Sequence, residues 1–149
     1  MHDNPQKLEN QLCFPLYAAA KEVVRLYRPL LDPLGLTYTQ YIAMLVLWEE
    51  QQASMKSLGE RLWLDSGTLT PLVKKMEAQG LITRQRDPGD ERSVLVGLTE
   101  EGKALQDQAA AVPARMAACL PLQPEENRQL YQLLHKTLKG LQCKSSDMG

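Results

Sequence analysis

Apolar residues in the first part of the chain recur at alternating steps of four and three positions, as on one face of a helix that packs against other helices. This pattern predicts a long helix over residues 12–31, which ends near Pro29, Pro33 and Gly35 because proline and glycine interrupt helices. A second helix follows, with Thr37 or Thr39 as its cap. The residues of the apolar stripe are Cys13, Tyr17, Ala20, Val24, Tyr27 and Leu31.

The middle of the chain changes from a helical to an alternating pattern. Residues 54–62 predict a short helix, and residues 63–67 predict a tight turn into another helix that stops at Gly80. Residues 81–86 and 93–98 alternate with period two and are joined by a polar segment, which is typical of a β-hairpin. This order indicates a winged helix-turn-helix, so the expected fold class is mainly α with a small β-hairpin wing.

The last part of the chain is again helical in pattern. Thr99 is a suitable cap for a long helix whose first turn holds Glu100 and Glu101, at the positive end of the helix dipole. Pro121 and Pro124 interrupt this helix, and residues 125–142 form a last helix with a leucine-rich side. Residues 144–149 are expected to be a loose tail.

The composition indicates one soluble globular domain over residues 1–149. The chain is 44% hydrophobic and 23% charged, and it has no stretch near the roughly 18 apolar residues that span a bilayer. Its first residues lack the apolar core of a signal peptide, so we expect a cytoplasmic protein with no membrane contact. The three cysteines are widely spaced, which fits neither a disulfide framework nor a metal site. We expect no metal and no other cofactor.

The charge distribution favours a local nucleic-acid contact. The net charge is only −1, yet residues 56–86 hold six basic and three acidic residues. In the second helix of the helix-turn-helix, Leu69, Val73 and Met76 lie on the core side, while the opposite side has small, hydroxyl and lysine residues that suit a DNA groove. Asp65 is expected to cap this helix. The candidate DNA contacts in it are Ser66, Gly67, Thr68, Thr70, Pro71, Lys74 and Lys75.

The hairpin supplies further basic candidates, namely Arg84, Arg86 and Arg92. Arg92 lies at the hairpin tip, where a guanidinium suits the negative potential of the minor groove. Asp90 is expected to hold this arginine in position. The alternative is that Arg92 only forms ion pairs on the protein surface.

Residues 58–82, the segment Asp90-Glu91-Arg92 and the segment 98–102 resemble the MarR family of transcriptional regulators. The similarity covers nearly the whole chain. It implies a homodimer in which residues 1–36 and 100–143 form dimerisation helices and residues 37–99 form the winged helix-turn-helix. It also implies binding to a pseudo-palindromic operator in double-stranded DNA, with half-sites about one helical turn apart.

The segment 8–17, together with residues 36–41, resembles the organic-hydroperoxide-sensing branch of this family, known as OhrR. The resemblance implies that Cys13 is a peroxidatic thiol surrounded by Tyr17, Tyr27 and Tyr38. It also implies that oxidation by an organic hydroperoxide releases the operator and derepresses peroxide-resistance genes. Cys119 lies near the position of the resolving thiol in two-cysteine members. The alternative is that Cys119 only serves as a small hydrophobic residue. In that case Cys143 or a small thiol is the resolving group.

Residue chemistry restricts how these groups meet. Attack on a peroxide requires a thiolate, which tyrosine hydroxyls stabilise by hydrogen bonding. Tyr17 lies one turn from Cys13, whereas Tyr27 lies about 21 Å farther along a helix that rises 1.5 Å per residue. Tyr27 therefore reaches a Cys13 only in a partner subunit. Pro15 either bends the helix or marks its start, and in the second case Cys13 lies at the positive end of the helix dipole.

Two other functions are compatible with the residues. One is a MarR-type repressor controlled by a small phenolic ligand, with an inert Cys13. The other is a thiol peroxidase, although such enzymes usually place their cysteine among alternating strands and helices, and here the only expected strands form the hairpin. Four apolar residues are candidates either for an entrance that admits hydroperoxides or for the core, namely Phe14, Leu16, Met44 and Trp48.

Overall fold

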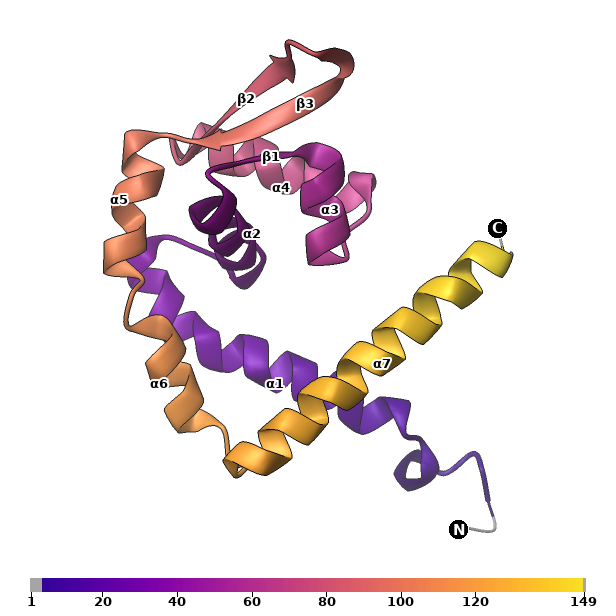
Figure 1. Ribbon diagram of the computed structural model, residues 1–149. Helices are drawn as coiled ribbons and strands as arrows, with labels where there is room; N and C mark the ends of the chain where they lie inside the picture. Colours follow the sequence, from indigo (N-terminus) through magenta and orange to yellow (C-terminus); the bar gives the residue numbers. More distant parts are fainter. Residues whose placement is uncertain (1–3, 149) are drawn as a thin grey trace. The chain divides into compact units, whose positions relative to one another are not determined.

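The computed structural model describes residues 4–148, which divide into two compact units, one ending at Met116 and the other beginning at Ala117. Each unit is described by itself (Figure 1). The helices are α1 (Cys13–Leu31), α2 (Tyr38–Glu50), α3 (Met55–Leu62), α4 (Ser66–Ala78), α5 (Glu100–Gln108), α6 (Val112–Cys119) and α7 (Pro124–Met148). The strands are β1 (Gln52–Ser54), β2 (Ile82–Asp87) and β3 (Asp90–Leu98), and the 3-10 turns are η1 (Leu8–Asn10) and η2 (Asp32–Leu34).

Helix α1 begins at Cys13, so Pro15 lies in its first turn. A proline is tolerated there because the first amide groups of a helix have no acceptor within it. Of the two alternatives for Pro15, the helix start is therefore confirmed. At the other end Pro29 lies inside α1, and the chain leaves through η2 and Gly35, whose φ of 70° is the left-handed conformation that glycine adopts without strain.

The predicted helix caps are present. Thr37, rather than Thr39, caps α2 in a capping box: its hydroxyl accepts from the Gln40 amide at 3.3 Å, and the Gln40 side-chain oxygen accepts from the Thr37 amide at 3.1 Å. Asp65 caps α4 by accepting from the Thr68 amide at 2.8 Å, and Thr99 caps α5. These caps fix where α2, α4 and α5 begin.

The wing is a three-stranded antiparallel sheet with the order β1-β3-β2. The predicted hairpin is confirmed, but the expectation that it holds the only strands is wrong, because Ala53 of β1 pairs with Val96 of β3. A strand of three residues is too short to show period-two alternation in the sequence. Figure 1 shows the β2–β3 hairpin extending away from α3 and α4.

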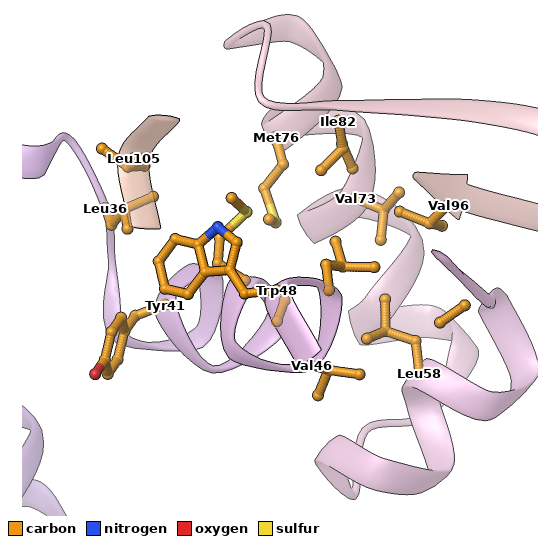
Figure 2. Packing of buried hydrophobic residues seen from close by; sticks show 14 of the residues in the cluster. Leu36, Tyr41, Val46, Trp48, Leu58, Val73, Met76, Ile82, Val96 and Leu105 are labelled. Atoms are coloured by element: carbon orange, nitrogen blue, oxygen red, sulfur yellow. The ribbon is translucent and has the colours of Figure 1, made fainter. Parts of the chain in front are cut away.

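The core lies between α2, α4 and the root of the wing (Figure 2). Trp48 is 7% exposed, and its indole Nε1 donates to the carbonyl oxygen of Gly102 at 2.9 Å. Met44 is fully buried, so both residues belong to the core and not to an entrance for hydroperoxides. The other two candidates for that entrance, Phe14 and Leu16, are exposed on α1.

One polar side chain, Gln40, is buried in this core with 1% exposure. Its amide nitrogen donates to the side-chain oxygen of Gln79 at 3.0 Å, and the amide nitrogen of Gln79 donates to the carbonyl oxygen of Gly35 at 3.2 Å. Gln79 is the C-cap of α4, and Gly35 lies in the turn that follows α1. These hydrogen bonds join the exit of α1 to the end of α4.

The C-terminal part departs from the prediction in two places. The long helix expected after Thr99 is broken at residues 109–111 into α5 and α6, because Pro113 has no amide hydrogen to continue the hydrogen-bond ladder and fits only a first turn. The loose tail expected from residue 144 is wrong, since α7 continues to Met148. The hydroxyls of Ser145 and Ser146 bond to carbonyls one turn back, and residues 141–148 contain no proline or glycine.

No single helix within residues 4–148 has the length and apolar character needed to cross a membrane. The segments Cys13–Leu34 and Tyr38–Glu50 meet that test only together, across a bend of 69°.

Candidate functional site

The outer face of α4 presents most of the predicted DNA contacts. Leu69, Val73 and Met76 are buried on the opposite face, as the spacing predicts. Thr70 is half-buried between the two faces. The predicted contacts that are exposed are Ser66, Gly67, Thr68, Pro71, Lys74 and Lys75.

The predicted capping role of Asp65 is confirmed at the N-terminus of α4. The backbone amide of Thr68 donates to its carboxylate, and this hydrogen bond lowers the pKa of Asp65 below its usual range. Asp65 is therefore ionised at neutral pH, and its carboxylate is hydrogen-bonded to the first turn of α4. The positive charge of this face comes from Lys74 and Lys75, both exposed between two and three turns farther along α4.

Two aspartates shape the tip of the wing through the backbone. Asp87 accepts from the amide of Gly89 at 2.9 Å, and Asp90 accepts from the amide of Arg92 at 3.0 Å. Asp90 thus holds Arg92 through its main chain, and this hydrogen bond is consistent with the expectation that Asp90 keeps the arginine in position. The side chains of Arg86 and Arg92 are exposed, and within the described part of the chain neither is in an ion pair.

Arg84 has different surroundings from the other two arginines of the hairpin. Its guanidinium donates to one carboxylate oxygen of Glu77 in α4, from Nε at 3.2 Å and from Nη2 at 3.0 Å. This pairing lowers the pKa of Glu77. Arg84 was predicted to contact DNA together with Arg86 and Arg92, but its guanidinium points to Glu77 of α4 instead.

Cys13 is an exposed free thiol at the first position of α1. The preceding residue, Leu12, has no side-chain group to cap the helix, so no side chain shields the positive end of the dipole beside the sulfur. Tyr17 follows one turn later and is 61% exposed, with the ammonium of Lys21 5.3 Å from its ring centre. Cys13 and Tyr17 are thus neighbours on an open surface.

The other two predicted tyrosines meet each other at the far end of α1. The ring centres of Tyr27 and Tyr38 are 4.8 Å apart, and that of Tyr41 is 5.7 Å from Tyr27. Burial raises the pKa of all three hydroxyls. Tyr41 is not among the predicted site residues, although its spacing of three from Tyr38 on α2 puts the two on one helix face. Within one chain, neither Tyr27 nor Tyr38 approaches Cys13, as the helix rise predicts.

Cys119 and Cys143 are also exposed free thiols, at the end of α6 and within α7. Within the described residues, no group of three or more histidine, cysteine, aspartate or glutamate side chains is placed to hold a metal ion.

The sequence matches the family model described as "Transcriptional regulator SarA/Rot" over residues 25–109. It is 50% identical over 139 residues to the organic hydroperoxide resistance transcriptional regulator of Bacillus subtilis (strain 168), covering 93% of this chain and 95% of that relative. The fold is similar to reduced AbfR bound to DNA, with a TM-score of 0.76, 36% identity and coverage of 90% of this chain and 93% of that chain. It is also similar to disulfide-formed AbfR, with a TM-score of 0.66, 37% identity and coverage of 90% and 91%.

These similarities confirm the winged helix-turn-helix fold predicted from the sequence. They also set aside the thiol-peroxidase alternative, because the matched family and relatives are transcriptional regulators and not enzymes. The chain belongs to the MarR/SarA-type family of winged-helix transcriptional regulators.

Proposed function

We propose that this protein is a homodimeric, cytoplasmic repressor that binds a pseudo-palindromic operator in double-stranded DNA and leaves it when an organic hydroperoxide oxidises Cys13. The observation that supports this most directly is an exposed thiol at the N-terminus of α1, on a helix that packs against the core at its C-terminal end but exposes apolar side chains nearer its start. The relatives are named for hydroperoxide resistance and, in AbfR, for reduced and disulfide forms.

The exposed apolar face of α1 supports the dimer. Leu16 and Val24 of α1 are 45% and 41% exposed, and Leu12, directly before this helix, is 85% exposed. Large apolar side chains exposed along a helix are typical of a protein–protein interface. Helix α7 likewise exposes Leu130, Leu133 and Leu141. We therefore assign residues 1–36 and 100–143 to dimerisation.

A two-fold axis across α1 would complete the sensor. An antiparallel crossing brings the Cys13 end of one α1 to the Tyr27 and Tyr38 end of the other, and the two ends are separated by about 21 Å within a chain. Because burial raises the pKa of both tyrosines, their hydroxyls stay protonated and serve as hydrogen-bond donors to a thiolate. Tyr17 of the same chain adds a donor one turn away.

The chemistry at Cys13 is a two-electron oxidation. The thiolate attacks one peroxide oxygen, the O–O bond breaks, and the departing alkoxide takes a proton to become an alcohol, which leaves a sulfenic acid on Cys13. A second thiolate then displaces hydroxide, which leaves as water after protonation, and a disulfide forms. Cys119 is the proposed resolving thiol, with Cys143 or a small thiol as alternatives.

On the DNA side, the exposed face of α4 suits the major groove and the tip of the wing suits the minor groove. Small side chains at Gly67 and Pro71 allow close approach, Thr68 offers a hydroxyl, and Lys74 neutralises phosphate. Arg86 and Arg92 are the arginines of the hairpin whose side chains form no ion pair with any residue from 4 to 148. A change in the relative orientation of the two α4 helices of a dimer would break the match to both half-sites at once.

The test uses a DNA duplex selected by the reduced protein from a random-sequence pool. We expect tight binding by the reduced protein, measured by fluorescence anisotropy, and at least a tenfold loss of affinity after one equivalent of cumene hydroperoxide. Cys13→Ser should bind the duplex and ignore the peroxide. Cys143→Ser is the matched control and should respond like the wild type.

Mass spectrometry of the oxidised protein identifies the resolving thiol. A peptide joining Cys13 to Cys119 supports the assignment, and a link to Cys143 or to an added small thiol replaces it. If the oxidised protein keeps its full affinity for DNA, the redox proposal is wrong. If Cys13→Ser still releases DNA, the inducer acts elsewhere, as in a repressor controlled by a phenolic ligand.

A further inference from the structure

An ion pair joins the DNA-contacting helix to the wing. Two nitrogens of the Arg84 guanidinium in β2 lie 3.2 and 3.0 Å from one carboxylate oxygen of Glu77 in α4. Both side chains are partly buried, with 30% and 38% exposure. Two donors on one acceptor restrict the guanidinium more than a single contact would, so the pair sets a defined spacing between the two elements.

The pair lies where the packing between α4 and the wing ends. Arg84 is two residues from Ile82, and the alternation of a strand puts both on the face of β2 that is turned toward the core. Ile82 is buried there near Val73 and Met76 (Figure 2). Farther out, residues 85–93 contribute nothing to the buried core. Within residues 4–148, the Glu77–Arg84 pair is the side-chain hydrogen-bonded connection between α4 and β2, and it lies beyond the apolar contacts of Ile82.

Glu77 is otherwise badly placed. It lies in the last turn of α4, where the negative end of the helix dipole disfavours a carboxylate. It also lies in the basic segment 56–86, where a negative charge repels DNA phosphates. Both effects act against an acidic residue at this position, and the contact with Arg84 is the interaction in the structure that offsets them. The lowered pKa of Glu77 keeps the pair charged at neutral pH.

We propose that Glu77 and Arg84 are positioning residues, which fix the wing against α4 so that the helix and Arg92 meet their two grooves together. Operator affinity then depends on an acidic residue that does not touch the DNA. This inference rests on the proposed DNA binding. Arg84 then supports the wing and does not contact the DNA. A wing that moved freely would have to be ordered each time the protein binds DNA, and this ordering would lower the affinity.

Neutral variants test the proposal, because the two explanations predict opposite changes in the affinity for the operator. Glu77→Gln removes a negative charge near the DNA, so electrostatics alone predicts tighter binding, whereas positioning predicts a loss of about two- to fivefold. Glu60→Gln is the matched control, since Glu60 is an exposed acid of α3 that forms no ion pair in the structure. This control should bind the selected duplex as well as the wild type or better.

Arg84→Met keeps the aliphatic stem and removes the charge. A positioning role predicts a loss similar to that of Glu77→Gln, an unchanged slope of log affinity against log salt concentration, and a double variant no weaker than either single variant. A phosphate contact predicts a slope smaller by about one. Circular dichroism at the assay temperature verifies that each variant is folded, and only folded protein is titrated.

The proposal is overturned if Glu77→Gln binds as tightly as the wild type or more tightly, or if Arg84→Met lowers the salt slope by one. It is upheld by losses that are equal, non-additive and independent of salt. If the reduced wild type binds no duplex from the pool, the proposed function itself fails, which is a distinct outcome from a wild type that binds while Glu77→Gln is unaffected.

Discussion

Gly102, in the first turn of α5, is a position where a single methyl group should have a large and measurable effect. A Cβ at this position would lie 2.1 Å from the carbonyl oxygen of Leu81 and 3.2 Å from its carbonyl carbon. The nearer distance is about 1.3 Å short of an ordinary van der Waals contact. The obstacle is backbone, so it cannot move aside as a flexible side chain would. Gly102→Ala therefore requires α5 to separate from the start of β2.

The size of the effect follows from three contributions. Overpacking in a rigid site typically costs about 1–3 kcal/mol. The hydrogen bond from the Trp48 indole to the Gly102 carbonyl is strained by the same displacement, and its loss costs about 1 kcal/mol. Alanine in place of glycine favours the helix by about 1 kcal/mol. The free energy of unfolding of Gly102→Ala should thus fall by about 2 kcal/mol.

Gly140→Ala is the matched control, because a Cβ at Gly140 in α7 meets nothing within 4 Å. The same substitution should there raise the free energy of unfolding by up to about 1 kcal/mol. Both variants are measured by urea unfolding at one protein concentration, since the proposed dimer would make stability depend on concentration. The reasoning is refuted if Gly102→Ala is as stable as the wild type, or if both substitutions shift stability in the same direction.

Three further predictions concern the core, the tyrosines and the wing. Trp48→Phe leaves the Gly102 carbonyl without its donor and should lower the free energy of unfolding by about 1–2 kcal/mol in urea; no change would show that the hydrogen bond is unimportant. Burial in the folded state raises the pKa of Tyr38, so the folded protein holds the hydroxyl proton more tightly than the unfolded chain does. The free energy of unfolding should therefore decrease as the pH rises above about 10. The decrease should be smaller in Tyr38→Phe, measured by urea unfolding at each pH. Arg92→Ala should weaken operator binding and lower the slope of log affinity against log salt concentration by about one, in titrations between about 50 and 200 mM salt. An unchanged slope would contradict a charge contact between Arg92 and DNA.

Local signals in the sequence were sufficient to predict where α4 and α5 begin. The hydroxyl of Thr99 and the carboxylate of Asp65 act on amides three residues away, so their capping roles could be predicted without knowledge of the fold. The start of α1 was open because Pro15 is compatible with a kink or a first turn. Only the structure places it in the first turn, with Cys13 at the helix start.

Features that depend on distant residues were missed. Strand β1 forms because Ala53 pairs with Val96, which lies 43 positions later in the chain. A segment of three residues has no sequence pattern that could predict such a pairing. Arg84 was grouped with the DNA contacts by its charge, and its contact with Glu77 depends on how α4 and β2 are placed together. The sequence did not decide whether Met44 and Trp48 line an entrance or belong to the core, because an apolar side chain is compatible with both positions. Their burial in the folded chain decides it.

The amide chain from Gly35 through Gln79 to Gln40 has a mechanical consequence. A flexible turn after α1 would absorb small displacements of that helix, but here the turn is hydrogen-bonded to Gln79, the C-cap of α4, and through it to the buried side chain of Gln40. A shift at the α1 exit must either break these bonds or drag the end of α4 along with it. The two hydrogen bonds therefore couple the position of the turn after α1 to the position of the α4 end.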